Sequence, residues 1–213
     1  MSDNHKYATE TAQWQVKSGF WTLGDLIVRI EDVFENDKDL TSKDAKTQAR
    51  QIVIPLWNQQ LATQQSWPKD EKTIADKLAA AFETLHQNHK IPARMNFTCC
   101  RTCGVYEIGL DLEGEKPVGY AFFHEQTTAG FTQYPGTPIM IYYGLFEGSE
   151  STSLDVANTV VQVLTEAGLS VEWNGDAKKA IQVSCEGWRK RLIEQESDSS
   201  YHNDEDEEGR QEE

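Results

Sequence analysis

Apolar side chains in the first third of the chain recur every three or four positions, the spacing of an amphipathic helix. Thr22 precedes the first run as an N-cap, the second run opens at Thr41-Ser42, and Pro68 stands near the first turn of the third. Pro55 interrupts the second run, so we expect a kink or a restart there. The three runs are Leu23, Leu26, Ile27, Ile30, Val33 and Phe34; Ala45, Ala49, Ile52, Val53, Leu56, Trp57 and Leu61; and Ile74, Leu78, Ala81, Phe82 and Leu85.

After Pro92 the apolar spacing changes to two, which is typical of strands. Residues 95–99 and 105–112 show this alternation, and residues 118–125 and 138–146 are the clearest strands, separated by a loop at 127–137. A helix over residues 154–164 follows, with Thr152 or Ser153 as its N-cap and Gly168 as its C-cap. Two further strands, at 169–173 and 180–185, flank a turn at 174–176.

Together these patterns predict an α+β fold. We expect an N-terminal third of about three helices to pack on a mixed, largely antiparallel sheet. The C-terminal half contributes one main helix of its own. We expect residues 1–12 to be a flexible arm, 13–91 a helical segment and 92–193 an α+β segment that forms one unit with it. Residues 194–213 carry ten acids and one base, a composition typical of a disordered acidic tail.

The chain is acidic throughout, with a net charge of −15, of which −9 lies in that tail. Such a surface argues against nucleic-acid or anionic-membrane binding and favours a protein partner with a basic surface. The basic run Arg189-Lys190-Arg191 is too short for a nucleic-acid footprint. No apolar run is long enough to span a membrane, and residues 1–12 are polar and lack the basic and apolar regions of a signal peptide, so a cytoplasmic location is expected. The oligomeric state does not follow from the sequence.

The cysteines carry the densest chemical signal. Cys100 and Cys103 form a C-x-x-C pair followed by Gly104, half of a zinc site. Because a structural zinc takes four ligands, the others would come from Cys99, His124 or Cys185. Two alternatives remain open: a reactive or redox dithiol, and reduced cysteines that fill the edge of a core.

His124 and Glu125 stand at a predicted strand end beside a glycine-bearing loop, where acid–base groups are often presented. Thr128 stands where a zincin motif needs its second histidine. The glycine-rich signatures of nucleotide-binding loops are absent, so no nucleotide cofactor is expected. The catalytic candidates are Cys100, Cys103, His124 and Glu125, with a cysteine thiolate as nucleophile and His124 as base.

Several short segments resemble a family of uncharacterised bacterial proteins classed as a domain of unknown function. The resemblance runs from about Gly19 to Arg191 and implies one family unit; it implies no activity. In place of an acidic run that the family carries after its histidine, this chain has residues 127–129, Thr-Thr-Ala. The segments that carry it are Gly19-Phe20, Leu56-Trp57, Trp67-Pro68, Asp76-Lys77-Leu78, Ala80-Ala81-Phe82, Phe97-Thr98-Cys99-Cys100, Cys103-Gly104, Gly119-Tyr120, Phe123-His124-Glu125-Gln126, Ala167-Gly168-Leu169, Val171-Glu172-Trp173 and Gly175.

The sequence therefore favours a cytoplasmic, non-enzymatic binding or interaction module, with a structural metal such as zinc at the cysteine cluster. The alternative is a thiol-dependent enzyme that uses Cys100 or Cys103 with His124.

Overall fold

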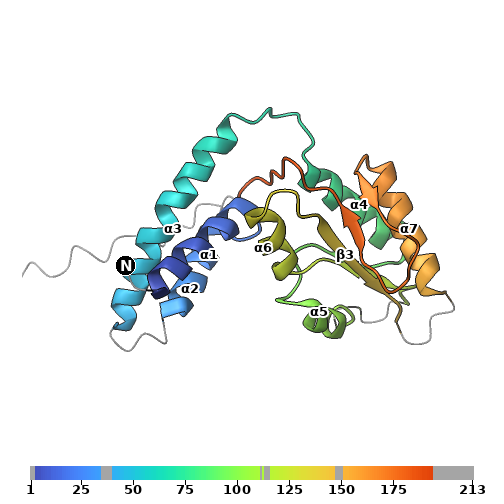
Figure 1. Cartoon of the computed structure of the whole chain (residues 1–213), viewed down its shortest axis with the longest axis horizontal. Helices are drawn as coiled ribbons and strands as arrows, with labels where there is room; N and C mark the ends of the chain where they lie inside the picture. The colour runs from blue at the N-terminus through green and yellow to red at the C-terminus, as the bar shows by residue number, and fades with distance from the viewer. Residues whose placement is uncertain (1–2, 35–39, 111, 113–115, 147–150, 194–213) are drawn as a thin grey trace, which may run out of the picture.

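The computed structural model describes residues 3–34, 40–110, 112, 116–146 and 151–193 (Figure 1). Within these ranges the chain has seven helices and one five-stranded sheet, which confirms the predicted α+β fold. A bundle of three helices lies at one end of the molecule and the sheet lies at the other (Figure 1). No helix in the described ranges is long and apolar enough to cross a bilayer. The predicted acidic tail lies outside these ranges.

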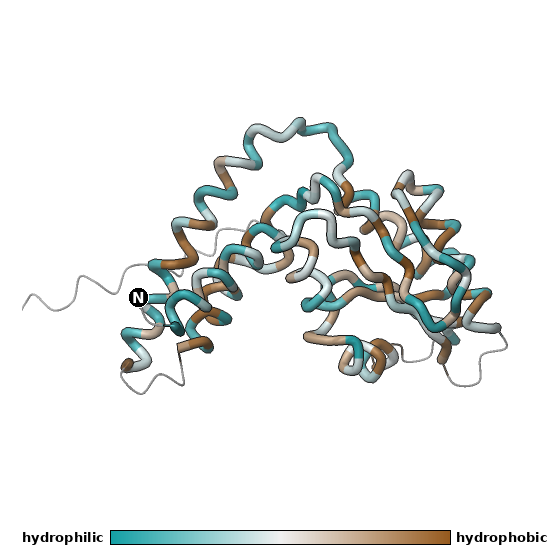
Figure 2. The backbone as a smooth tube through the Cα atoms, in the orientation of Figure 1, coloured by the Kyte–Doolittle hydropathy of each residue, from teal (hydrophilic) through white to brown (hydrophobic). Residues whose placement is uncertain are grey.

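The bundle consists of α1 (Asp3–Ser18), α2 (Leu23–Phe34) and α3 (Ser42–Gln65). Thr41 caps α3 through a reciprocal pair of hydrogen bonds with Asp44, which satisfies two backbone N–H groups at the helix start. Hydrophobic and hydrophilic residues alternate along α3 in Figure 2, as expected of a helix with one buried face. The bundle core contains Leu26, Ile30, Phe34, Ala45, Ala49, Ile52, Val53 and Trp57.

This region differs from the expectation at its N-terminus, and at Pro55 it excludes a restart of the helix. Residues 3–12 belong to α1 and not to a flexible arm, because Ala8 and Ala12, one turn apart, are fully buried against the other two helices. Small residues allow close helix packing but carry little hydropathic signal in a polar segment. The second finding is that α3 continues as one helix through Pro55, with Ile52, Val53 and Trp57 buried on either side of it.

The sheet has the strand order β1-β2-β3-β5-β4. Only the pair of β1 and β2 is parallel; the other three pairs are antiparallel, which confirms the mixed, largely antiparallel prediction. The strands predicted at 118–125, 138–146, 169–173 and 180–185 are present but shorter than expected, whereas the strand at 93–94 was not predicted. Their bounds are β1 (Ala93–Arg94), β2 (Tyr120–Phe122), β3 (Ile139–Gly144), β4 (Val171–Glu172) and β5 (Ile181–Val183).

One face of the sheet is covered by α4 (Ile74–His89) and α7 (Ser153–Glu166), both predicted from their apolar spacing. Thr73 and Thr152 each cap their helix through the same threonine–aspartate exchange that begins α3. Gly168 follows α7 with a φ of 74°, as its predicted role at the helix end requires. The core of this face includes Leu78, Phe82, Leu85, Ala121, Ile139, Ile141, Val160, Leu164, Ile181 and Val183.

The opposite face is covered by a short helix, α5 (Arg101–Glu107), and the residues that follow it. Tyr120 and Phe122 of β2 point to this side, and Phe122 is fully buried together with Ile108. The prediction of a strand over residues 105–112 was therefore wrong. Its alternating apolar residues cover only part of the sheet surface, and Val105 and Tyr106 are exposed.

The segment after β2 also differs from the prediction. Residues expected to lie in a strand end and a loop form α6 (Glu125–Gln133), which begins directly after His124. Thr128 and Thr132 are buried in this helix, and Thr132 Oγ1 donates a hydrogen bond within it to Thr128 O (2.6 Å). A helix rich in threonine and glycine gives no clear periodicity.

Aromatic side chains join the bundle to the sheet. The ring of Phe20 lies 5.9 Å from the rings of both Phe123 and Trp188, measured between centroids. Trp188 Nε1 donates a hydrogen bond to Ser18 O at the end of α1. One ion pair adds to this junction, because Arg29 of α2 contacts Glu125 of α6 at 2.6 Å. The two predicted segments thus share direct side-chain contacts.

We predict that Gly19→Ala destabilises the protein by roughly 1–3 kcal/mol. Gly19 has a φ of 76°, and a Cβ there would lie 2.7 Å from Lys190 O. Denaturant unfolding measures the loss. The control is Gly175→Ala, because Gly175 has a φ of 80° but nothing within 4 Å of the added carbon. An equal loss in both variants would show that the contact with Lys190 does not matter.

We also predict that Gly104→Ala destabilises the protein by about 1–3 kcal/mol, because the new methyl group would overlap the ring of buried Phe122. Gly130→Ala in α6 is the helical control, because its nearest neighbour would be at an ordinary 3.7 Å. Thermal unfolding of Gly104→Ala with and without Phe122→Leu tests the cause. Failure of the smaller side chain to restore any stability would contradict the packing explanation.

Candidate functional site

A tight loop between β1 and α5 presents the cysteines. Asn96 and Thr98 have φ values of 51° and 54°, in the left-handed region that β-branched residues rarely adopt. The segment predicted as a strand over 95–99 is therefore irregular. Phe97 N donates to Phe123 O (2.8 Å), and Glu125 N donates to Thr98 O (3.0 Å). These bonds fix the loop to the end of β2 and the start of α6.

Two side chains hold the same loop from within. Thr128 Oγ1 donates to Asn96 Oδ1 at 2.7 Å, and Thr98 Oγ1 donates to Cys100 O at 3.2 Å. Backbone strain of this kind persists only where surrounding contacts stabilise it, and it is frequent at functional sites. Sequence reasoning missed Asn96 and Thr98 because the alternation of apolar residues around them suggested a strand; asparagine, which tolerates the left-handed region, was the one available signal.

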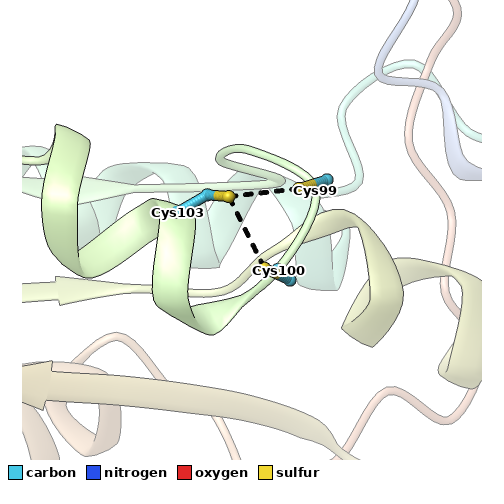
Figure 3. Close-up of side chains that lie close together, drawn as sticks. All are labelled: Cys99, Cys100 and Cys103. Carbon is cyan, nitrogen blue, oxygen red and sulfur yellow. Dashed lines mark hydrogen bonds between the residues drawn. The ribbon is translucent and has the colours of Figure 1, made fainter.

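The loop and the first turn of α5 bring three sulfurs together (Figure 3). The Sγ of Cys103 lies 3.4 Å from the Sγ of Cys99 and 3.6 Å from the Sγ of Cys100. All three sulfurs lie within 4.8 Å of one another. Cys100 precedes α5 as its N-cap residue and Cys103 sits one turn on, and the sulfurs of Cys99 and Cys100 both lie against that of Cys103. Cys99 is exposed and the other two are half-buried, which places the group at the surface.

The thiols of Cys100 and Cys103 differ in acidity. A hydrogen bond from the backbone N–H of Cys103, followed by those from the Cys103 and Cys99 thiols, lowers the pKa of Cys100. The same cluster opposes ionisation of its third member: hydrogen bonding to Cys99 and then to Cys100 raises the pKa of Cys103 to about 12. Of Cys100 and Cys103, Cys100 therefore forms the thiolate first, with Cys103 as a proton donor to it.

His124 lies outside the sulfur group, although the sequence analysis placed it among the metal ligands. It is the N-cap of α6, where its Nδ1 accepts a hydrogen bond from Thr127 N at 3.2 Å. Its ring stacks on Tyr142 with 5.0 Å between centroids. Burial, and then the nearby Arg101 guanidinium, lower the pKa of His124. A neutral ring with Nδ1 as acceptor carries its proton on Nε2, so neither nitrogen has a free lone pair.

The other two candidates also lie apart from the sulfurs. Cys185 is buried and its thiol donates to Thr137 O at 2.8 Å. Burial raises the pKa of Cys185, which is the behaviour of an unreactive core thiol. Glu125 forms the ion pair with Arg29 at the start of α6. Among the described residues, the group close enough to share one ion thus contains Cys99, Cys100 and Cys103 alone.

Arg101 is a neighbour of the sulfurs that the sequence analysis left without a role. It stands between Cys100 and Cys103, and its guanidinium lies 5.2 Å from the ring centroid of Tyr142. Arg101 and His124 therefore both contact the ring of Tyr142. These contacts connect the start of α5 to the start of α6. The signal for it was present, since a cation inside a C-x-x-C pair favours the thiolate.

The comparisons agree with the resemblance found in the sequence. No curated protein matches the chain, and no solved structure matches it. The family described as a domain of unknown function, DUF6891, has a model that matches residues 1–192, which include the bundle, the sheet and the cysteine loop. The chain therefore belongs to the DUF6891 family.

Proposed function

We propose that this protein is a non-enzymatic binding module that holds a thiophilic metal ion, with zinc as the first choice, at Cys99, Cys100 and Cys103. The observation that carries this proposal is the mutual distance of the sulfurs. Tetrahedral zinc with Zn–S bonds of about 2.3 Å places two sulfur ligands roughly 3.8 Å apart. The sulfur–sulfur separations of 3.4 and 3.6 Å around Cys103 are within a few tenths of that value.

The three cysteines fit the ion chemically as well as geometrically. Thiolate is the ligand that zinc and other soft ions prefer, and an ion would replace the thiol protons that the cluster now shares. Bound zinc would neutralise most of the charge of the three thiolates, and its bonds to them would link the loop to α5. A fourth ligand comes from water or from an outside donor, because no further His, Cys, Asp or Glu among the described residues joins the group.

The ion would also stabilise a weak element. The helix α5 has seven residues, and Gly104 is its one buried residue. So short a helix is marginal without tertiary contacts. Zinc bound to Cys99 in the loop and to Cys103 in the helix would cross-link them, as structural zinc does in small domains.

The module acts in the cytoplasm, where a reducing environment keeps surface thiols available for a metal. Its partner is a protein with a basic surface, attracted by the net charge of −15. The surface position of the sulfur group lets such a partner lie beside it or provide its fourth ligand.

A thiol-dependent activity is the second candidate, and one observation favours it. Cys100 and Cys103 combine a lowered and a raised pKa at a sulfur separation of 3.6 Å, the asymmetry of a dithiol with one nucleophile and one proton-holding partner. The role of His124 as base in that reaction is not supported, because Thr127 N occupies its acceptor nitrogen.

For the metal site we predict about one zinc ion per chain in untagged protein, bound with release of thiol protons and more tightly as pH rises. Replacing Cys99, Cys100 or Cys103 by Ser should weaken zinc binding by at least the roughly 10- to 100-fold that loss of an outer-shell partner costs. Mass spectrometry and competition with a chromogenic chelator measure both. Cys185→Ala is the matched control and should bind like wild type. Equal zinc affinity in the Cys99→Ser variant would contradict the three-cysteine site.

For the thiols we predict that Cys100 alkylates faster than Cys103 and Cys185 with iodoacetamide at neutral pH in metal-free protein, because hydrogen bonds stabilise its thiolate and the pKa values of the other two thiols are raised. Peptide mapping of a time course identifies the modified residue. His124→Asn, which keeps an N-cap side chain, should leave the rate within about twofold of wild type. A much slower reaction in that variant would restore the cysteine–histidine enzyme as the leading hypothesis.

A further inference from the structure

A second site lies between α4, the end of β1 and the segment after β5, with residues that differ from those of the sulfur group. It is a cavity of about 290 Å³, close to the lower end of the range for small-molecule sites. Phe20, Phe82 and Met95 form apolar walls. Three basic side chains also line it: His86, Arg94 and Lys190.

None of these basic groups has an acidic partner within ion-pair distance among the described residues. The ion pairs found there are Lys6–Glu10, Arg29–Glu125 and Arg189–Glu71. Arg94 Nη1 donates to the adjacent carbonyl of Ala93. Half-buried guanidinium and ammonium groups are usually paired with a carboxylate. Two such groups without an ion pair around one cavity therefore indicate an anion-binding site.

Lys190 is the most constrained of the three. Its Nζ lies 5.2 Å from the ring centroid of Phe20, and the loss of water around it lowers its pKa, although Asp76 acts in the opposite direction. Its backbone packs against Gly19, where no side chain could be accommodated without a shift. The ammonium is thus held at the cavity wall at a cost in hydration that a bound anion would offset.

His86 adds an unsatisfied polar atom. Its Nδ1 is buried and has no hydrogen-bond partner. The acid on the cavity wall, Glu83, is exposed and accepts a hydrogen bond from Gln87, one turn along α4. The cavity lining therefore carries two cationic side chains and one carboxylate, Glu83, with Asp76 acting on Lys190 from nearby, in a chain whose net charge is −15.

We propose that this cavity binds a small molecule that carries an oxyanion, a carboxylate or a phosphate, on an apolar or aromatic body. Lys190 and Arg94 take the charged oxygens, and His86 hydrogen-bonds to a polar atom of the same ligand. The body packs against Phe20, Phe82 and Met95. Arginine and lysine both bind such oxygens, and the arginine fork suits either planar carboxylate or phosphate.

The test uses phenyl phosphate, benzoate, inorganic phosphate and benzyl alcohol as probes of the full-length chain. Methyl-labelled methionine provides the readout, because Met95 lines the cavity while Met140 lies in β3 as an internal control. We expect phenyl phosphate or benzoate to shift the Met95 signal in a saturable way and leave Met140 unchanged. Which of the two binds more tightly distinguishes a phosphate from a carboxylate ligand. Benzyl alcohol should bind about tenfold or more weakly, because it lacks the charge-assisted hydrogen bonds.

Substitutions complete the test. Lys190→Met and, separately, Arg94→Gln should each weaken binding of the better anion by about tenfold. Lys178→Met is the control, because Lys178 does not line the cavity. This variant should bind the probe like the wild-type protein. The proposal is overturned if neither aromatic anion shifts Met95 at millimolar concentration, if benzyl alcohol binds as well as they do, or if inorganic phosphate alone gives the full effect. Equal weakening by Lys178→Met would also overturn it.

Discussion

A sheet with apolar side chains on both faces must be covered on both, and this constraint shapes the rest of the molecule. On one side of β2, Ala121 and the following Phe123 meet the thick layer formed by α4 and α7. On the other side, Tyr120 and Phe122 meet a thin layer built by α5 and its neighbours. Leaving such aromatic rings in water would cost on the order of 1.5–3 kcal/mol each.

The thin layer explains why the cysteines lie where they do. Gly104 lets α5 approach the ring of Phe122 closely, which brings Cys100 and Cys103 over the sheet edge. The strained residues Asn96 and Thr98 then turn the chain so that Cys99 faces the other two cysteines. A cross-link adds more stability to a short helix with little buried surface than to a long one. The proposed metal site lies at such a helix, α5, which is the thinnest cover of the sheet.

The sequence predicted the long elements and the sulfur group, and it failed where the signal depends on distant partners. Amphipathic runs with a threonine cap, such as α7 behind Thr152, carry their own local evidence. The helix α1 was missed because its buried face is alanine, and α6 because threonine and glycine show no apolar period. Cys100 and Cys103 are neighbours by spacing, whereas the placement of His124 and Cys185 depends on tertiary contacts that spacing does not contain.

The junction between the bundle and the sheet combines two kinds of contact with different sensitivities. Phe20 packs between Phe123 and Trp188, and this apolar contact hardly responds to dissolved ions. The pair of Arg29 and Glu125 is partly exposed and is weakened by salt. Ionic strength therefore weakens the contact of α2 with α6 while the aromatic contacts persist, so high salt removes one of the links between bundle and sheet and leaves the others in place.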